Sequence, residues 1–73
     1  MTLKMKLEEM RVQGNGVMYC RFDALKDEKN IPVSPEIESK SGVRATIQIA
    51  LVEGAADELR SCKVYDVSFT QVQ

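Results

Sequence analysis

The tripeptide Gly14-Asn15-Gly16 constrains the fold of this chain more than any other feature. Two glycines around an asparagine readily take the positive φ angles that a tight β-hairpin turn requires. The residues after it, 17–25, alternate between the two faces of an extended segment, with Met18, Cys20, Phe22 and Ala24 on one face and Val17, Tyr19, Arg21 and Asp23 on the other. The sequence therefore predicts an antiparallel hairpin about this turn.

The stretch before the turn, residues 3–12, also alternates, but its phase changes once. The apolar residues have one parity at first and the opposite parity later: Leu3, Met5 and Leu7, then Met10 and Val12. Because a shift of one residue turns every later side chain to the other face, we expect a β-bulge at Glu8-Glu9. A short amphipathic helix over residues 3–10 is the alternative, since helical spacing is also kept.

The last part of the chain has the pattern of strand, short helical turn and strand. Residues 43–51 alternate strictly, which is typical of a half-buried strand, with Val43, Ala45, Ile47, Ile49 and Leu51 on one face. Residues 55–60 have room for little more than one or two helical turns. Residues 62–72 then extend again, with Tyr65, Val67 and Phe69 on a common face. The centres of the alternating runs supply five side chains that we expect among the most buried: Phe22, Ile47, Ile49, Val67 and Phe69.

A turn-like cluster at residues 26–30 ends the second strand, and a long connection, residues 31–42, follows and holds both prolines. Proline removes a hydrogen-bond donor and biases the residue before it toward extended geometry. Ile31, Val33 and Ile37 are apolar, so we expect part of the connection to pack along the sheet as an irregular edge.

These patterns together predict one small domain, residues 1–73. The fold class is mainly β, with α+β as an alternative: a curled antiparallel sheet or half-barrel of about four strands with one short helical turn. A chain this small buries only about 60% of its unfolded surface, so we expect a homo-oligomer to supplement the core.

Cys20 and Cys62 stand among apolar neighbours and are expected to be small buried side chains. A disulfide between them would require their strands to pair closely.

Charge and hydropathy argue against two classes of partner. Ten basic and eleven acidic residues are interspersed and give a net charge of −1, so no basic tract supports non-specific duplex binding. No apolar run approaches the roughly 18 residues needed to span a bilayer. Without a signal-peptide pattern near the first residue, we expect a soluble protein of the cytoplasm.

The sequence offers little catalytic chemistry. It contains no histidine, so neither a Ser-His or Cys-His pair nor a zinc site built on two isolated cysteines is expected. We therefore expect a protein without enzymatic activity, metal or cofactor.

The outward face of the predicted sheet is the better candidate for function. Tyrosine and arginine are over-represented at protein interfaces, and arginine also pairs with phosphate. We expect this face to bind a partner protein or a small anionic ligand, although an ordinary solvated face has the same composition. The candidate binding residues are Tyr19, Arg21, Arg44, Thr46 and Gln48.

Residues 45–49, ATIQI, and 63–72, KVYDVSFTQV, resemble the closing half of small phage-encoded β-proteins of unassigned function. In that family a strand of alternating threonine and apolar residues leads to a final strand ending in Tyr-x-x-Asp-Phe-Thr-Pro. Here Ser68 stands in place of the acid and Gln71 in place of the proline. The resemblance implies a phage or prophage origin and no catalytic residue.

We therefore expect a small non-enzymatic, phage-encoded binding protein that occupies a partner protein or sequesters a small anionic ligand, as counter-defence proteins do. One alternative is a single-stranded nucleic-acid-binding module with an OB-like sheet that stacks bases on Tyr19, Tyr65 or Phe22. The balanced charge makes nucleic acid the less favoured partner. A virion or assembly component is a third possibility.

Overall fold

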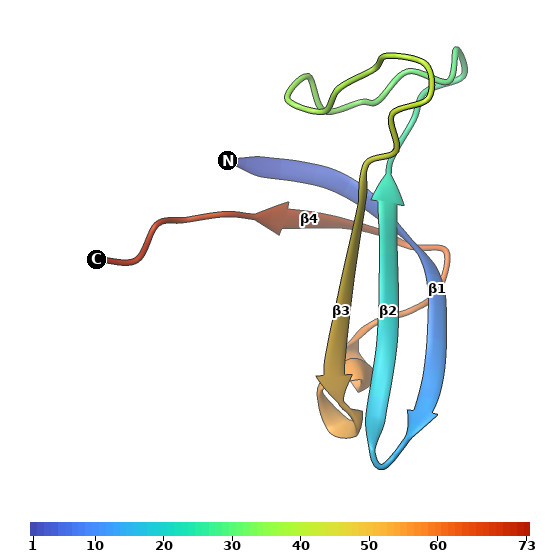
Figure 1. Cartoon of the computed structure of the whole chain (residues 1–73), viewed down its shortest axis with the longest axis vertical. Helices are drawn as coiled ribbons and strands as arrows, with labels where there is room; N and C mark the ends of the chain where they lie inside the picture. Colours follow the sequence, from blue (N-terminus) through green and yellow to red (C-terminus); the bar gives the residue numbers. More distant parts are fainter.

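A computed structural model describes the whole chain, residues 1–73. Four strands form one open antiparallel sheet in the order β3-β2-β1-β4 (Figure 1). The elements are β1 Thr2–Gly14, β2 Val17–Ala24, β3 Thr46–Val52, the short 3₁₀ helix η1 Glu53–Glu58, and β4 Val64–Ser68. The predicted class, mainly β with a curled four-stranded sheet and one short helical turn, is confirmed.

The hairpin between β1 and β2 forms where the glycines predicted it. Gly14 pairs with Val17, and the two residues between them have positive φ angles, 56° at Asn15 and 73° at Gly16. Two positive φ angles in a two-residue loop define a type I′ turn, whose twist matches that of the flanking strands.

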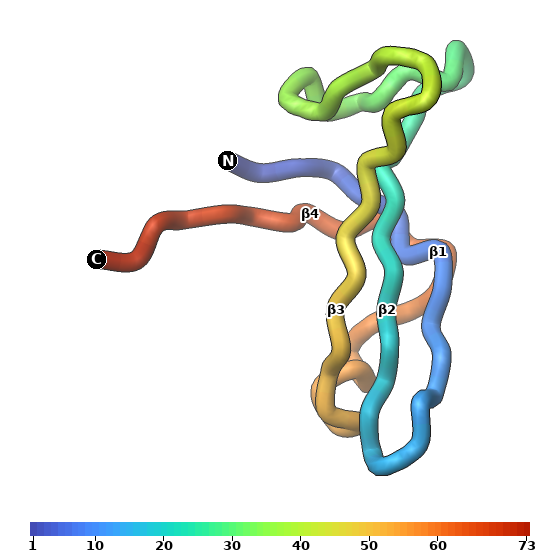
Figure 2. The backbone as a smooth tube through the Cα atoms, in the orientation of Figure 1, coloured from blue at the N-terminus to red at the C-terminus, as the bar shows by residue number.

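The predicted bulge is also present, and β1 is a strand where a helix was the alternative. The register of β1 against β2 shifts between Leu7 and Glu9, so Glu8 is the extra residue. A bulge bends its strand and increases the local twist. The first half of β1, together with β4, accordingly runs across the direction of β2 and β3 (Figures 1 and 2).

The core lies on one side of this bent sheet, which we call the apolar face. Met5, Leu7, Cys20 and Phe22 are buried at its centre. Half-buried apolar side chains surround them, namely Leu3, Met10, Met18, Ile47, Leu51, Leu59, Tyr65 and Val67. Helix η1 contacts β2 and β3, and its Ala56 is buried. The core is small, because only six of 73 residues are buried.

Two of the five residues expected in the core are exposed, and so is Val43, which alternation placed on the same face; each has a local reason. Ile49 is 38% exposed because β3 is an edge strand with no neighbour beyond it. Phe69 is 49% exposed because it pairs with Met1, whereas the pairing of β1 with β2 begins only at Met5. Val43 precedes β3 and is exposed just after the turn at Gly42. Of the five expected core residues, Phe22 is buried, whereas Ile47 and Val67 are half-buried.

The two cysteines differ from each other. Cys20 is buried, as predicted, but Cys62 is exposed, and both thiols are free. Cys62 lies in the turn before β4 with a φ of 68°. The prediction of a buried Cys62 was wrong, because the final strand begins only at Val64.

The start of the long connection is fastened to the sheet, whereas its later part extends away (Figure 1). Val33 N donates to Leu25 O at 2.8 Å, and the buried Ser34 accepts the backbone N–H of Lys4 on its Oγ at 2.7 Å. Part of the connection thus contacts the sheet as expected, but it does so through Ser34 and not through the apolar side chains of Ile31 and Val33. Ile31 and Val33 keep exposed side chains.

Candidate functional site

Four of the five predicted binding residues share the side of the sheet opposite the core, which we call the polar face. Tyr19 lies opposite Ala50, and Arg21 opposite Gln48. Thr46 lies opposite Asp23 in the same pair of strands. Arg44 lies outside β3 and is exposed. The structure therefore does not place Arg44 opposite Arg21 on a neighbouring strand.

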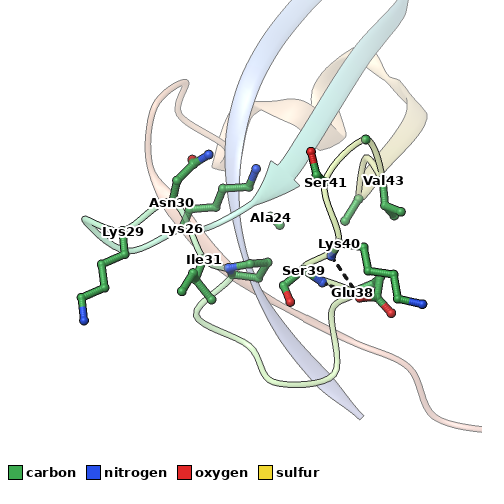
Figure 3. A pocket seen from close by; sticks show the side chains of 13 residues that line it. Ala24, Lys26, Lys29, Asn30, Ile31, Glu38, Ser39, Lys40, Ser41 and Val43 are labelled. Atoms are coloured by element: carbon green, nitrogen blue, oxygen red, sulfur yellow. Dashed lines mark hydrogen bonds between the residues drawn. The ribbon is translucent and has the colours of Figure 1, made fainter.

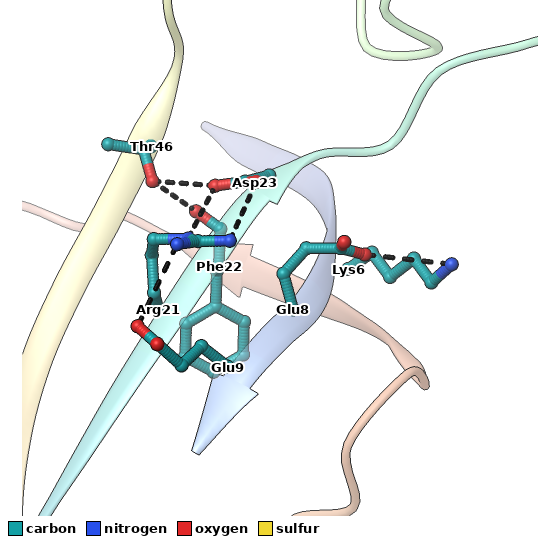
Figure 4. Close-up of polar contacts among 7 residues, drawn as sticks. All are labelled: Lys6, Glu8, Glu9, Arg21, Phe22, Asp23 and Thr46. Atoms are coloured by element: carbon teal, nitrogen blue, oxygen red, sulfur yellow. Dashed lines mark hydrogen bonds and ion pairs between the residues drawn. The ribbon is translucent and has the colours of Figure 1, made fainter. Parts of the chain in front are cut away.

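Arg21 is held by carboxylates of the chain itself (Figure 4). Its Nη1 lies 3.7 Å from Glu9 Oε1 on β1, and its Nε lies 3.3 Å from Asp23 Oδ1. Thr46 Oγ1 donates to the same Asp23 oxygen at 2.7 Å. The network joins three strands of the sheet, and its two carboxylates outnumber its one guanidinium.

The geometry of this network limits what Arg21 can bind. Its Nε is buried and makes no aligned hydrogen bond, so the 3.3 Å approach to Asp23 is an ion contact. Tyr19 is also occupied, because Arg11 stacks 5.6 Å from the centre of its ring. An anionic ligand would therefore have to displace Glu9 or Asp23 from Arg21.

A hollow of about 380 Å³ opens between the end of β2 and the long connection (Figure 3). Lys26, Lys29 and Lys40 line it, and none of them takes part in an ion pair. The ammonium groups of Lys29 and Lys40 point away from its centre, however (Figure 3). Glu38 brings a carboxylate, which accepts the backbone N–H groups of Ser39 and Lys40 at 3.0 Å each. The hollow thus lacks a set of cations that converge on one point.

The apolar face is only partly covered by other elements of the chain. It is closed around Phe22 by β4, since the rings of Phe22 and Tyr65 meet edge to face. Toward β3 it opens, and Ile47, Ile49 and Leu51 form its margin. β3 contacts only β2 and η1.

The outer edge of β3 also carries free backbone groups. Ala45 O accepts from Ala24 N, and Glu53 N donates to Gly16 O, so odd-numbered residues of this segment bond to β2. In an antiparallel ladder the intervening residues direct both backbone groups to the other side. These outward residues are Thr46, Gln48, Ala50 and Val52. Sequence reasoning missed this edge, although the signal was present: residues 46–52, TIQIALV, contain no charge, glycine or proline.

Reactive chemistry is sparse in the structure. Burial raises the pKa of the Cys20 thiol above its usual range, which disfavours the nucleophilic thiolate. No three His, Cys, Asp or Glu side chains gather as metal ligands would. The structure has no helix with the length and apolar character needed to cross a bilayer.

Comparison of the chain with protein-family models, with curated proteins and with solved structures found no match.

Proposed function

We propose that this protein is a small, non-enzymatic binding protein that works by contacting another protein chain through the margin of its apolar face and the β3 edge. The observation that carries the proposal is the uncovered β3, where free backbone groups adjoin half-exposed apolar side chains. Adding a strand to such an edge supplies main-chain hydrogen bonds, and the apolar side chains supply the selectivity.

The total surface area supports the same proposal. The chain exposes 5582 Å², whereas a compact folded protein of 8.2 kDa exposes about 4,500 Å². The difference, roughly 1,000 Å², exceeds the ~800 Å² that a standard interface takes from each partner. Its radius of gyration, 13.4 Å, is likewise larger than the ~11 Å of a compact chain of this length.

A small anionic ligand is the less supported version of this function. The arginine that was expected to bind it, Arg21, already faces Glu9 and Asp23. The lysines of the hollow do not converge (Figure 3). Single-stranded nucleic acid is also less supported, because Phe22 is buried against Tyr65 while Tyr19 lies on the opposite face.

The proposed setting is the cytoplasm of a cell that carries a phage or prophage. The resemblance of residues 45–49 and 63–72 to phage-encoded β-proteins favours a phage or prophage origin for this protein-binding role. Two free thiols fit action in the reducing cytoplasm.

Two probes and one cross-linker test the proposal. Inorganic phosphate and oligo-dT are titrated into ¹⁵N-labelled protein, and neither should produce saturable shifts. In the source cell, photoreactive benzoylphenylalanine at position 49 should cross-link to a discrete protein, whereas the same group at position 29 should not. Saturable phosphate shifts around Lys26 and Lys40, or oligo-dT shifts around Tyr19, would overturn it, as would equal cross-linking from positions 49 and 29.

A further inference from the structure

We infer that the chain bound at the β3 edge is a second copy of this protein, paired β3 to β3 in antiparallel fashion about a two-fold axis at Ile49. This inference rests on the proposed function, because it names the partner for the same surface. Two four-stranded sheets would then join into one continuous sheet with a common apolar face.

The two edges of the sheet are not equally protected. Proteins guard edge strands with charge, proline, bulges or short length, since an unguarded edge pairs with other chains. The β4 edge has five residues and carries Asp66, which pairs with Lys4 at 3.0 Å. The β3 edge has seven residues and contains no charged residue, proline or bulge. Only β3 is therefore open to strand addition.

The sequence of β3 is compatible with its own copy in one full-length register. Centring the axis on Ile49 brings Ile49 opposite itself and Ile47 opposite Leu51 of the second copy. Both pairs lie on the apolar face, because residues directly opposite each other in an antiparallel pair share a face. Gln48 then meets Ala50 on the polar face. The outward backbone groups of Gln48 and Ala50 face one another, as hydrogen-bonded pairs require.

Electrostatics and area are both compatible with a second copy as the occupant. No charged residue of β3 meets its own copy across the axis, so the pairing brings no like charges together. The net charge of −1 adds little repulsion between the two chains. The ~1,000 Å² by which this chain exceeds a compact monomer is of the size that one subunit buries in a stable dimer.

The geometry at the axis gives a direct chemical test. Because the backbone groups of Ile49 bond to β2, the pair of Ile49 residues would be a non-hydrogen-bonded pair with Cα atoms about 4.5 Å apart. This separation is within the range that a disulfide spans. In a Cys62→Ser background, Ile49→Cys should therefore form a covalent dimer under mild oxidation. Val64→Cys is the matched control, because Val64 is also half-exposed but lies at the β4 edge.

The mass of the unmodified protein is measured alongside by sedimentation velocity over a hundredfold range of concentration. We expect twice the monomer mass at high concentration. Ile49→Lys should lose the dimer, Ile49→Glu should lose it too, and a mixture of the two should restore it, because residue 49 faces its own copy. Circular dichroism shows whether each variant is folded.

Three results would overturn the inference: a monomer mass at every concentration, equal cross-linking of the Ile49→Cys and Val64→Cys proteins, or no restored dimer from folded Ile49→Lys and Ile49→Glu chains. A monomer that still cross-links a different protein from position 49 would overturn the inference and leave the proposed function standing.

Discussion

The rings of Phe22 on β2 and Tyr65 on β4 meet edge to face, 6.0 Å apart at an interplanar angle of 88°, although β1 lies between their strands in the sheet. The bulge at Glu8 bends β1 and carries β4 over the apolar face, which makes this contact possible. Tyr65 is fixed from its other end as well, because its hydroxyl accepts the backbone N–H of Arg60 at 2.7 Å. The small core depends on this contact.

Phe22→Ala should therefore destabilise the fold strongly. Phe22 is 5% exposed, and truncating a buried phenylalanine costs about 3–5 kcal/mol. Phe69→Ala is the matched control and should cost less than about 1 kcal/mol, because Phe69 is half-exposed and lies beyond β4. Urea denaturation of both variants measures the difference. Equal losses would mean that Phe69 belongs to the core after all.

Two glycines should respond differently to the same substitution. Gly16→Ala places a Cβ at a φ of 73°, a left-handed conformation that costs an L-residue about 1–2 kcal/mol. Gly54→Ala should be neutral or slightly stabilising, because Gly54 has no positive φ and open space around it. Thermal denaturation of the two variants checks this prediction. An unchanged midpoint for Gly16→Ala would contradict the type I′ turn.

Arg21 and Arg44 should also differ, in stability rather than in ligand affinity. Arg21→Ala leaves Glu9 and Asp23 without their cation and should cost about 0.5–1 kcal/mol, less at high salt. Arg44→Ala removes an exposed side chain without an ion pair and should change stability by less than about 0.5 kcal/mol. Denaturation curves at low and high salt separate the two. A salt-independent loss in the Arg21→Ala protein would show that its packing matters more than its charge.

The cysteines should label at different rates. Cys62 is exposed and should react quickly with a thiol reagent, whereas Cys20 should react only when the fold opens.

Burial raises the pKa of Cys20, so the folded state holds that proton more tightly than the unfolded state does. The resulting stability is present in full below the unfolded thiol pKa of about 8.5 and is lost as the pH rises through the folded value. Thiol labelling of the native Cys62→Ser protein from pH 7 to 10 tests both the burial of Cys20 and the loss of stability at high pH. Fast reaction at pH 7 would contradict the burial of Cys20.

The sequence predicted the local features of this fold and missed those set by strand order. The type I′ turn at Asn15-Gly16 and the bulge at Glu8 depend on neighbouring residues, and a single sequence shows them. The exposure of Ile49 depends on β3 lying at an edge, which alternation cannot reveal. Phe69 was misplaced because it pairs with Met1, beyond the part of β1 that pairs with β2. Cys62 was misplaced because it takes a positive φ in the turn before β4.

The candidate site was predictable only in part for the same reason. Alternation placed Tyr19, Arg21, Thr46 and Gln48 on one face correctly. It could not show that Glu9 lies opposite Arg21, since that pairing depends on the register of β1 after the bulge. The register of β1 thus decides whether Glu9 joins Asp23 beside Arg21.

The most direct test of the account is amide hydrogen exchange in β3 as a function of protein concentration. We expect Gln48 and Ala50 to exchange quickly in dilute solution and to become protected as the second copy pairs with the β3 edge. Ile47 and Ile49, whose amides face β2, should be protected at every concentration. Fast exchange of Gln48 and Ala50 at all concentrations, beside protected Ile47 and Ile49, would contradict the pairing of β3 with a second copy.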